Sequence, residues 1–262
     1  MEQFNRKSLK KALRSNILTI GSWISLAHPA IAEIMADAGF DWLTIDMEHS
    51  VITIREAEEL IRIIDLKGKT PLVRVTSNEP NQIKRVMDAG AHGVIVPMVN
   101  SREQAEAAVR AVKYPPFGTR GVGLARAQKY GAGFDDYVRW LEEEAVVIAQ
   151  VEHIDAINNL DSILTTEGID GTIVGPYDLS ASMGKPGKFE DADVMGAIAR
   201  YEEISRKLNK PLGYHVVPPD YTQVKARIEK GYSFVAYSTD FLFLGGKCGE
   251  DLKKIRFAVV NG

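Results

Sequence analysis

The 262-residue sequence predicts a single (β/α)₈ barrel. Eight short apolar segments, rich in β-branched residues and bounded by turn residues, alternate with helical patterns, as buried parallel strands alternate with helices. A barrel of this type takes about 250 residues, so one barrel would use nearly the whole chain. No linker or low-complexity tract divides the sequence, and we therefore expect one domain over residues 1–262.

The expected strands are short and leave room for a helix between each pair. They begin near residues 17, 42, 71, 93, 146, 171, 211 and 233, with the sequences ILTIGSWIS, WLTIDM, PLVRV, GVIVPM, VVIAQVE, GTIVG, PLGYHVV and SFVAYST. A flat doubly wound sheet is the competing arrangement, but it usually carries a glycine-rich phosphate turn after its first strand. Here the first strand leads into SLAHPA, which favours the barrel.

The helices are marked by apolar spacing and by end signals. A capping box, Thr53 with Glu56, opens TIREAEELIRIIDLKG, and Pro80 stands near the start of EPNQIKRVMDAG. Further helices are expected in PAIAEIMADAG, SREQAEAAVRAV, FDDYVRWLEEEA and YTQVKARIEKG, with a short amphipathic helix over 5–15 and a last helix over about 245–259. Two βα connections are long, one through residues 114–144 and one over 176–193, and such loops are usually functional.

Composition excludes several classes of function. The formal net charge is −3, which gives no basic surface for nucleic acid or for an anionic membrane. No apolar run reaches the roughly 20 residues that cross a bilayer, and no apolar stretch follows the basic first dozen residues as in a secretory signal. The single cysteine, Cys248, rules out an internal disulfide and a thiolate metal cage, so we expect a cytoplasmic protein.

Polar residues gather where the predicted strands end, and the active site of a barrel is built at these carboxyl ends. The candidates, in chain order, are Asp46, Glu48 and His49, Arg74, Glu152 and His153, Asp178, His215 and Asp240. No lysine with apolar neighbours stands at such a position, because Lys113 and Lys129 fall in a helix or a loop. A Schiff-base mechanism, which needs a desolvated lysine, is therefore not predicted.

Two carboxylates indicate a divalent metal. Glu152 ends an apolar strand, where a carboxylate is costly to bury unless it is paired or binds a cation. Asp178 follows the next strand, and together the two would offer hard oxygen ligands to Mg²⁺ or Mn²⁺, with other positions left to water and substrate. The alternatives are a salt bridge or helix cap for Glu152 and an N-cap for Asp178. The sequence has no zinc-binding spacing of His or Cys.

A second group of residues suits proton transfer and anion binding. His49 lies three residues after Asp46, and a carboxylate partner fixes the tautomer of an imidazole and raises its basicity; a structural histidine is the alternative. Arg74, inside an apolar strand, is expected to hold an anionic oxygen of the substrate or of a neighbouring carboxylate. Glu48 either faces away from the mouth or holds the loop, and Trp23 either packs in the first strand or lines the pocket.

The sequence resembles the metal-dependent, class II pyruvate aldolases of the HpcH/HpaI family, whose wider relatives include citrate lyase-type enzymes. The segments that carry the resemblance are AGFDWLTIDMEHS (38–50), PLVRV (71–75), GAHGVIVPMVNSREQAEAAV (90–109), YPPFGTRGVG (114–123), AQVEHIDAINNLDSI (149–163) and GIDGTIVGPYDLSASMG (168–184). Their order covers nearly the whole chain, and such a series is far more specific than any one motif.

The resemblance implies a metal-dependent aldol cleavage of 4-hydroxy-2-oxo acids into pyruvate and an aldehyde. It implies Mg²⁺, Mn²⁺ or Co²⁺ on Glu152 and Asp178, and His49 as the base with Asp46 as its orienting partner. Arg74 would stabilise the enolate oxygen. Amides around Gly175 and Pro176 and in the following loop are expected at the pyruvate carboxylate, and Arg120 at the acceptor or a neighbouring subunit. A hexamer is also implied, with the last helix exchanged between neighbours.

Two departures from the family pattern leave the aldehyde open. His153 follows QVE, where relatives usually have a small hydroxyl residue, and the eighth strand ends in Tyr237-Ser238-Thr239-Asp240 instead of V-G-S-D. A CoA-ester lyase and an oxaloacetate decarboxylase are the alternative enzymes, although the modest charge argues against a site for CoA phosphates. A barrel that only binds or scaffolds is disfavoured, because all five of the residues Asp46, His49, Arg74, Glu152 and Asp178 are present.

Overall fold

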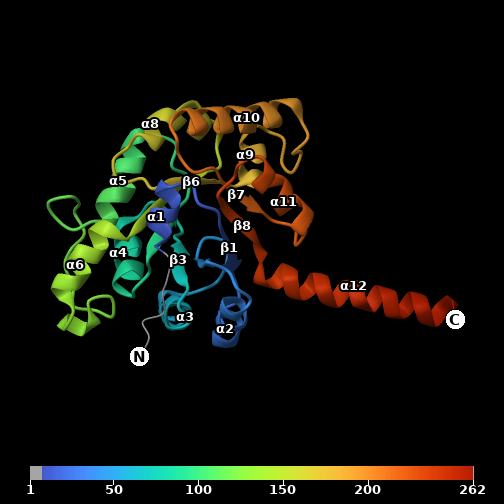
Figure 1. Cartoon of the computed structure of the whole chain (residues 1–262), viewed down its shortest axis with the longest axis horizontal. Coiled ribbons are helices and arrows are strands. Elements are labelled where there is room, and N and C mark those ends of the chain that lie inside the picture. The colour runs from blue at the N-terminus through green and yellow to red at the C-terminus, as the bar shows by residue number, and fades with distance from the viewer. Residues whose placement is uncertain (1–7, 262) are drawn as a thin grey trace.

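In the computed structural model, which describes residues 8–261, eight parallel strands close into a barrel in chain order (Figure 1). The strands are β1 (Thr19–Ile24), β2 (Trp42–Asp46), β3 (Thr70–Arg74), β4 (Gly93–Val96), β5 (Val146–Val151), β6 (Gly171–Val174), β7 (Gly213–Val216) and β8 (Phe234–Thr239). The last strand pairs with the first, with Thr19 opposite Phe234. The predicted single barrel and its eight strands are confirmed.

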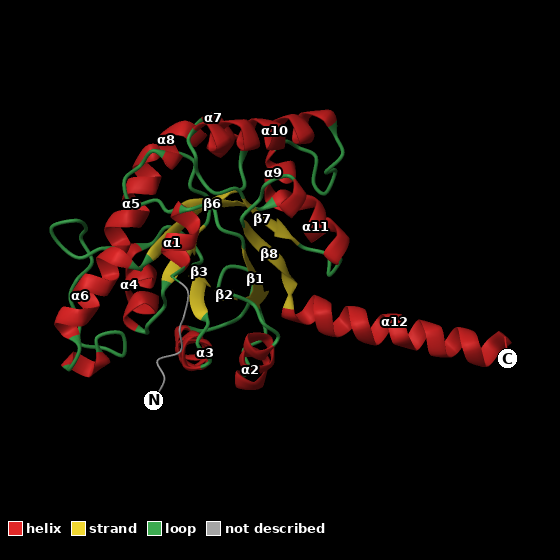
Figure 2. Cartoon of the chain, viewed as in Figure 1, coloured by secondary structure: helices red, strands yellow, loops and turns green. Residues whose placement is uncertain are grey.

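Helices follow every strand; those between the strands lie around the outside of the barrel, and α12, after the last strand, projects away from it (Figure 2). They are α1 (Leu9–Arg14), α2 (Pro29–Asp37), α3 (Ile54–Leu66), α4 (Pro80–Asp88), α5 (Arg102–Val112), η1 (Lys129–Gly131), α6 (Phe134–Glu143), α7 (Ile154–Asn158), α8 (Leu160–Leu164), α9 (Pro176–Ser182), α10 (Ala192–Lys207), α11 (Tyr221–Glu229) and α12 (Asp240–Asn261). The capping box of Thr53 and Glu56 forms as predicted. Residues 5–7 of the first expected helix lie outside the described residues.

The interior of the barrel is filled by alternate residues of each strand, because successive side chains of a strand point to opposite faces. On β2, Trp42 packs inside the barrel, whereas Leu43 and Ile45 pack in the layer under the helices. The indole of Trp42 stacks on Phe234 with ring centroids 4.5 Å apart. A Cβ atom at Gly21 would lie 2.0 Å from this indole, so glycine is needed there. The same alternation turns Asp46 inward at the other end of the strand.

Helix α1 closes the amino-terminal end of the barrel. Leu9 and Leu13 join the interior cluster that contains Trp42 and Phe234. Between them, the buried Nζ atom of Lys10 donates to the carbonyl of Ala145 at 2.7 Å and lies 3.3 Å from a carboxylate oxygen of Asp170. A buried ammonium needs such partners, so these contacts fix the helix over the end of the barrel.

The two long connections lie at different places. The segment 113–133 follows α5, which has already crossed from the carboxyl to the amino end of the barrel, so this segment lies away from the mouth. The expectation that residues 114–144 form part of a long βα connection is therefore wrong for the stretch that follows α5. The segment 183–191 follows the short α9 and lies near β7. Within residues 8–261, no helix is both long and apolar enough to cross a membrane.

Candidate active site

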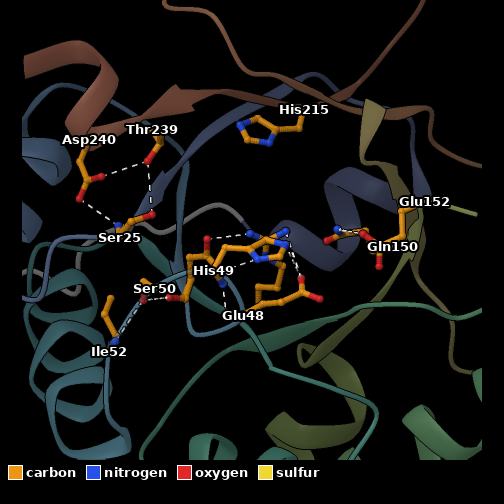
Figure 3. A network of polar contacts seen from close by, with 12 residues as sticks. Ser25, Glu48, His49, Ser50, Ile52, Gln150, Glu152, His215, Thr239 and Asp240 are labelled. Carbon is orange, nitrogen blue, oxygen red and sulfur yellow. Dashed lines mark hydrogen bonds and ion pairs between the residues drawn. The ribbon is translucent and has the colours of Figure 1, made fainter. Parts of the chain in front are cut away.

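A cavity of about 170 Å³ lies at the carboxyl ends of the strands. Its wall contains residues from six strands or the turns that follow them: Trp23, His49, Arg74, Gln150, Ile173, Val174, Gly175, Pro176, Tyr177, Asp178, His215 and Val217. The sequence-predicted residues Trp23, His49, Arg74, Gly175, Pro176 and Asp178 are thus brought together. Figure 3 shows the polar side chains around it.

Asp46 and Arg74 form a buried, two-pronged ion pair. The carboxylate Oδ1 accepts from Nε of Arg74 at 2.9 Å, and Oδ2 accepts from Nη2 at 2.6 Å. The two residues are direct neighbours in the register of β2 and β3. The guanidinium also stacks over the ring of Trp23, 4.4 Å from its centroid. Arg74 is therefore a fixed positive charge in the wall of the cavity, held by a neighbouring carboxylate.

His49 lies at the rim, and its ring is not held by Asp46. Its side chain is 61% exposed, and Nε2 lies 3.9 Å from Oε2 of Glu48. Asp46 instead accepts from the backbone amides of Glu48 and His49, at 3.1 and 3.2 Å. The predicted contact between carboxylate and imidazole is thus replaced by a contact with the backbone. Asp46 shapes the turn that carries His49, and the imidazole is accessible to a substrate.

Glu48 faces the site, which the sequence left open. Its Oε2 lies 3.2 Å from Nη1 of Arg74, without hydrogen-bond geometry. Burial raises the pKa of Glu48 to about 7; Arg74 opposes the rise, and the carboxylates of Glu152, Asp46 and Asp178 add to it. Glu48 is therefore a carboxyl group that gains and loses its proton near neutral pH beside His49.

Replacing Glu48 with glutamine is expected to stabilise the metal-free protein at pH 8. A carboxyl whose pKa is raised on folding is ionised more easily in the unfolded chain, so stability falls as the pH rises from about 4.5 to 7 and stays low above it. The glutamine variant has no carboxyl group at this position, so its folding stability does not fall over this pH range. Its melting temperature in EDTA should exceed that of the wild type by several degrees at pH 8, since about 1 kcal/mol corresponds to about 2–4 °C here.

At pH 5 the same comparison should show a smaller gain, because the wild-type carboxyl is then protonated in the folded state. Glu58→Gln, in an exposed pair with Arg62 on α3, is the matched control. If Glu48→Gln raises the melting temperature by the same amount at pH 5 and pH 8, the raised pKa of Glu48 is contradicted.

Glu152 and Asp178 are the residues that could hold a metal. Glu152 is buried, and its Oε1 accepts from the amide of Met98 at 2.6 Å. Its Oε2 accepts from the side-chain amide of Gln150. Burial raises the pKa of Glu152, its two hydrogen bonds oppose this, and the charge of Asp178 adds to the rise. A cation between the two carboxylates would relieve both the desolvation and the repulsion.

The donor set fits a hard divalent cation with open positions. Within residues 8–261, no group of three or more His, Cys, Asp or Glu side chains forms a metal cage. Two carboxylates leave most of the roughly six positions of Mg²⁺ or Mn²⁺ for water and substrate, which suits a catalytic site better than a structural one. Gly175 lies against Glu152, since a Cβ atom there would be 3.5 Å from Oε2 of Glu152.

Two predicted contributions from the cavity wall need revision. Trp23 both packs and lines the pocket, and its buried Nε1 has no hydrogen-bond partner. The amide of Gly175 already donates to the carbonyl of Val151 at 3.1 Å, and Pro176 has no N–H. An amide that binds the pyruvate carboxylate would therefore have to come from the turn that follows these two residues, and this part of the expectation stays a prediction; both residues line the cavity.

Three other candidates have structural roles outside this cavity. Arg120 is buried between rings, with Nη2 donating to the hydroxyl of Tyr137 at 2.8 Å and the guanidinium 4.3 Å from the ring centroid of Tyr114. His153 caps α7 by accepting from the amide of Asp155. Asp240 accepts from two backbone amides of the β1–α2 turn, one of which belongs to Ser25 (Figure 3).

Gln150 is the site residue that sequence reasoning missed. It lies two residues before Glu152 on β5, so it faces the same side of the strand, and its side-chain amide holds the Glu152 carboxylate. Its own Oε1 is buried without a partner. The two-residue spacing before a strand-end carboxylate is the signal that could have identified it.

Comparison with known proteins places the chain in a family. The sequence model described as HpcH/HpaI aldolase/citrate lyase matches residues 19–244. The chain is 39% identical over 253 residues to a pyruvate aldolase of Rhizobium etli, with 95% of this chain and 96% of that protein covered. It is 39% identical over 233 residues to a hydroxypyruvate/pyruvate aldolase of Pseudomonas aeruginosa, with 88% and 86% covered.

A solved structure agrees with these relatives. An HpcH/HpaI aldolase/citrate lyase family protein of Burkholderia cenocepacia matches with a TM-score of 0.90 at 33% identity, with 95% of this chain and 99% of that chain covered. The barrel fold is shared, and the sequences match along nearly the whole length of the chain. The chain belongs to the HpcH/HpaI aldolase/citrate lyase family.

Proposed function

We propose that this chain is a pyruvate aldolase, a carbon–carbon lyase that reversibly cleaves 4-hydroxy-2-oxo acids into pyruvate and an aldehyde. The observation that carries the proposal is the cavity in which the guanidinium of Arg74, the imidazole of His49 and the carboxylate of Asp178 meet. The eight relatives compared, at 35–39% identity, all bear aldolase names, which favours this reaction over that of a CoA-ester lyase.

Glu152 and Asp178 would hold a divalent cation, for which Mg²⁺, Mn²⁺ and Co²⁺ are the candidates. When bound, such a cation would supply Lewis acidity to the keto oxygen of the 2-oxo acid. Gln150 and the amide of Met98 hold the Glu152 carboxylate in place through their hydrogen bonds. These contacts orient the ligand before the cation arrives.

Arg74 and His49 supply the remaining chemistry. Arg74 presents a fixed positive charge to the oxygen that becomes negative when the C3–C4 bond breaks, and a preorganised charge of this kind needs no rearrangement during the reaction. His49 takes the proton of the C4 hydroxyl during cleavage, and returns it to the new alkoxide during synthesis. Asp46 holds both groups, through the side chain of Arg74 and the backbone of His49.

Metal removal tests the proposed function. Pyruvate release from a racemic 4-hydroxy-2-oxo acid, followed with a coupled dehydrogenase, should fall at least about 10²-fold in EDTA and return with added Mg²⁺, Mn²⁺ or Co²⁺. Glu152→Gln should keep little activity under any of these conditions, with exposed Glu143→Gln on α6 as the matched control. Undiminished cleavage in EDTA, or no cleavage by the wild type with any metal, would overturn the proposal.

We also propose that the chain assembles as a hexamer in which α12 is exchanged between neighbours. Helix α12 leaves the barrel and projects away from it (Figure 1). Large apolar side chains along it are exposed, among them Leu244, Leu252, Ile255 and Val259. An exposed apolar stripe of this length indicates a surface that packs against another chain.

Charges on this stripe are expected to break the assembly. Leu252→Glu with Ile255→Glu should reduce the mass measured by light scattering from that of a hexamer to that of a smaller species, because a buried interface would not accept two unpaired carboxylates. Lys253→Glu, exposed on the same helix, is the control and should keep the wild-type mass. A monomeric wild type would contradict the proposed assembly.

The proposed compartment is the cytoplasm. Cys248 is a free thiol and is exposed on α12. An exposed free thiol persists best where thiols are kept reduced, which supports this compartment over an oxidising one.

A further inference from the structure

His215 stands at the junction of two cavities and has no part in the chemistry described so far. It lies on β7 and lines the catalytic cavity together with His49, Arg74 and Asp178. It also lines a larger hollow of about 660 Å³, formed with the segment 187–191 and the turn after β7. Pro176, Tyr177 and Val217 belong to both walls as well. A substrate that extends from the catalytic cavity into the larger hollow would pass this imidazole.

The contacts of His215 determine which nitrogen carries the proton. Nε2 lies 3.3 Å from the backbone carbonyl of Ser238, and a carbonyl only accepts, so Nε2 is the N–H that donates. The ring packs against Trp23, with centroids 5.1 Å apart, and Trp23 in turn lies against Arg74. Figure 3 shows no interaction of His215 with the side chains of His49, Glu48 or Glu152.

The imidazole is neutral over the working range of pH. Burial lowers the pKa of His215 to about 3; the nearby positive charge of Arg74 adds to this fall, and the Ser238 carbonyl and Asp46 oppose it. In a neutral imidazole with its proton on Nε2, Nδ1 is an acceptor and cannot donate. His215 therefore offers the cavity an uncharged acceptor beside the cation of Arg74.

We infer that His215 is a specificity-determining residue, whose Nδ1 accepts a hydrogen bond from a hydroxyl group of the acceptor aldehyde. Neither the keto oxygen nor the ionised carboxylate of pyruvate can donate, so the partner of Nδ1 must be an O–H group elsewhere in the substrate. The C4 hydroxyl is the group that His49 deprotonates. The position of His215 at the entrance to the larger hollow assigns the partner to the next carbon, and the preferred acceptors are 2-hydroxyaldehydes.

The inference rests on the proposed aldolase function and deepens it. The test compares aldol addition of pyruvate to glycolaldehyde and to acetaldehyde, which differ only in the hydroxyl group. In His215→Leu, the ratio of kcat/KM for glycolaldehyde to that for acetaldehyde should fall about tenfold, the effect of one lost hydrogen bond. His215→Asn, whose amide oxygen can accept, should restore part of the ratio.

Val217→Ala is the matched control, because Val217 lines the same two cavities and its side chain offers no hydrogen bond. This variant should change both aldehydes alike and leave the ratio unchanged. A ratio that does not change in His215→Leu overturns the inference. The inference is also overturned if His215→Leu lowers kcat/KM for the addition of hydroxypyruvate to acetaldehyde instead. The hydroxyl group that His215 binds would then belong to the donor, hydroxypyruvate, and not to the aldehyde.

Exchange of the pyruvate methyl protons in D₂O distinguishes a failure of this inference from a failure of the proposed aldolase function. Exchange reports enolate formation and needs no aldehyde. If the wild type and His215→Leu exchange the methyl protons at equal rates and the ratio of kcat/KM for the two aldehydes is unchanged, only the role of His215 is overturned. A wild type that neither exchanges these protons nor cleaves a 4-hydroxy-2-oxo acid overturns the proposed function, and the role of His215 falls with it.

Discussion

His49→Ala is expected to lower kcat for aldol cleavage by about 10²–10⁴-fold, the usual contribution of a general base. Decarboxylation of oxaloacetate should survive within a few-fold, because loss of CO₂ gives the same enolate without removing a hydroxyl proton. Arg74 and the carboxylates that serve this enolate are untouched by the substitution. The rim position and 61% exposure of the imidazole also mean that its loss leaves no buried void.

The rates of aldol cleavage and of oxaloacetate decarboxylation are measured on the same preparation of each variant. Pyruvate is the product of both reactions. Affinity for Mn²⁺, measured by calorimetry, should equal that of the wild type. His153→Ala is the control, since His153 caps α7 and does not line the cavity. If His49→Ala abolishes Mn²⁺ binding, His49 is a ligand and its role as the base is wrong. Loss of both reactions with intact Mn²⁺ binding would place His49 in enolate formation.

Arg74→Ala is expected to lower both reactions by about 10²–10³-fold, because both pass through an enolate whose charge Arg74 faces. It should also destabilise the fold by about 3–5 kcal/mol, since the buried Asp46 carboxylate loses both hydrogen bonds to the guanidinium. Urea unfolding measures the loss of stability, and the rates of aldol cleavage and oxaloacetate decarboxylation measure the loss of activity. Arg74→Lys keeps a charge without the planar fork and should lie between Arg74→Ala and the wild type.

A double variant keeps this prediction testable if Arg74→Ala fails to fold. Arg74→Met with Asp46→Asn removes both buried charges, so most of the lost stability should return. Activity should not return, because the positive charge is still missing. A stable double variant that decarboxylates oxaloacetate at the wild-type rate would show that Arg74 only supports the fold.

The barrel was predictable because its signals are local. A capping box such as that of Thr53 and Glu56 depends on neighbours three residues apart, and a buried strand is marked by its own apolar run. Helix α12 shows the limit of such signals. It begins at Asp240, five residues before the expected start, because the Asp240 carboxylate bonds the amide of Phe241 and two amides of the β1–α2 turn.

Partners across the site were harder to predict, because they depend on register between strands. The sequence places Asp46 and Arg74 at the ends of two strands, but a shift of one residue would turn either side chain to the other face. The observed register makes them direct neighbours, so the carboxylate that was expected to hold His49 holds Arg74 instead. Glu48 follows the strand, where no alternation fixes the direction of a side chain.

Arg120 illustrates a different limit. The sequence assigns the segment that contains it to a long βα connection, because it lies between two predicted strands and is rich in proline and glycine. Helix α5 follows β4 directly and occupies the whole crossing, which leaves the rest of the connection at the opposite end. Counting residues between strands does not show whether a long loop comes before or after the helix.

The closure of the barrel by α1 has a kinetic consequence. With Leu9 and Leu13 packed into the amino end, residues 8–261 leave no passage through the barrel, and we expect substrate and both products to share one opening. If the 2-oxo acid part binds at the inner end, beside Arg74 and the proposed metal ligands, the aldehyde part lies nearer the exit. We then expect the aldehyde to leave first and pyruvate last, so that pyruvate inhibits cleavage competitively with the 4-hydroxy-2-oxo acid.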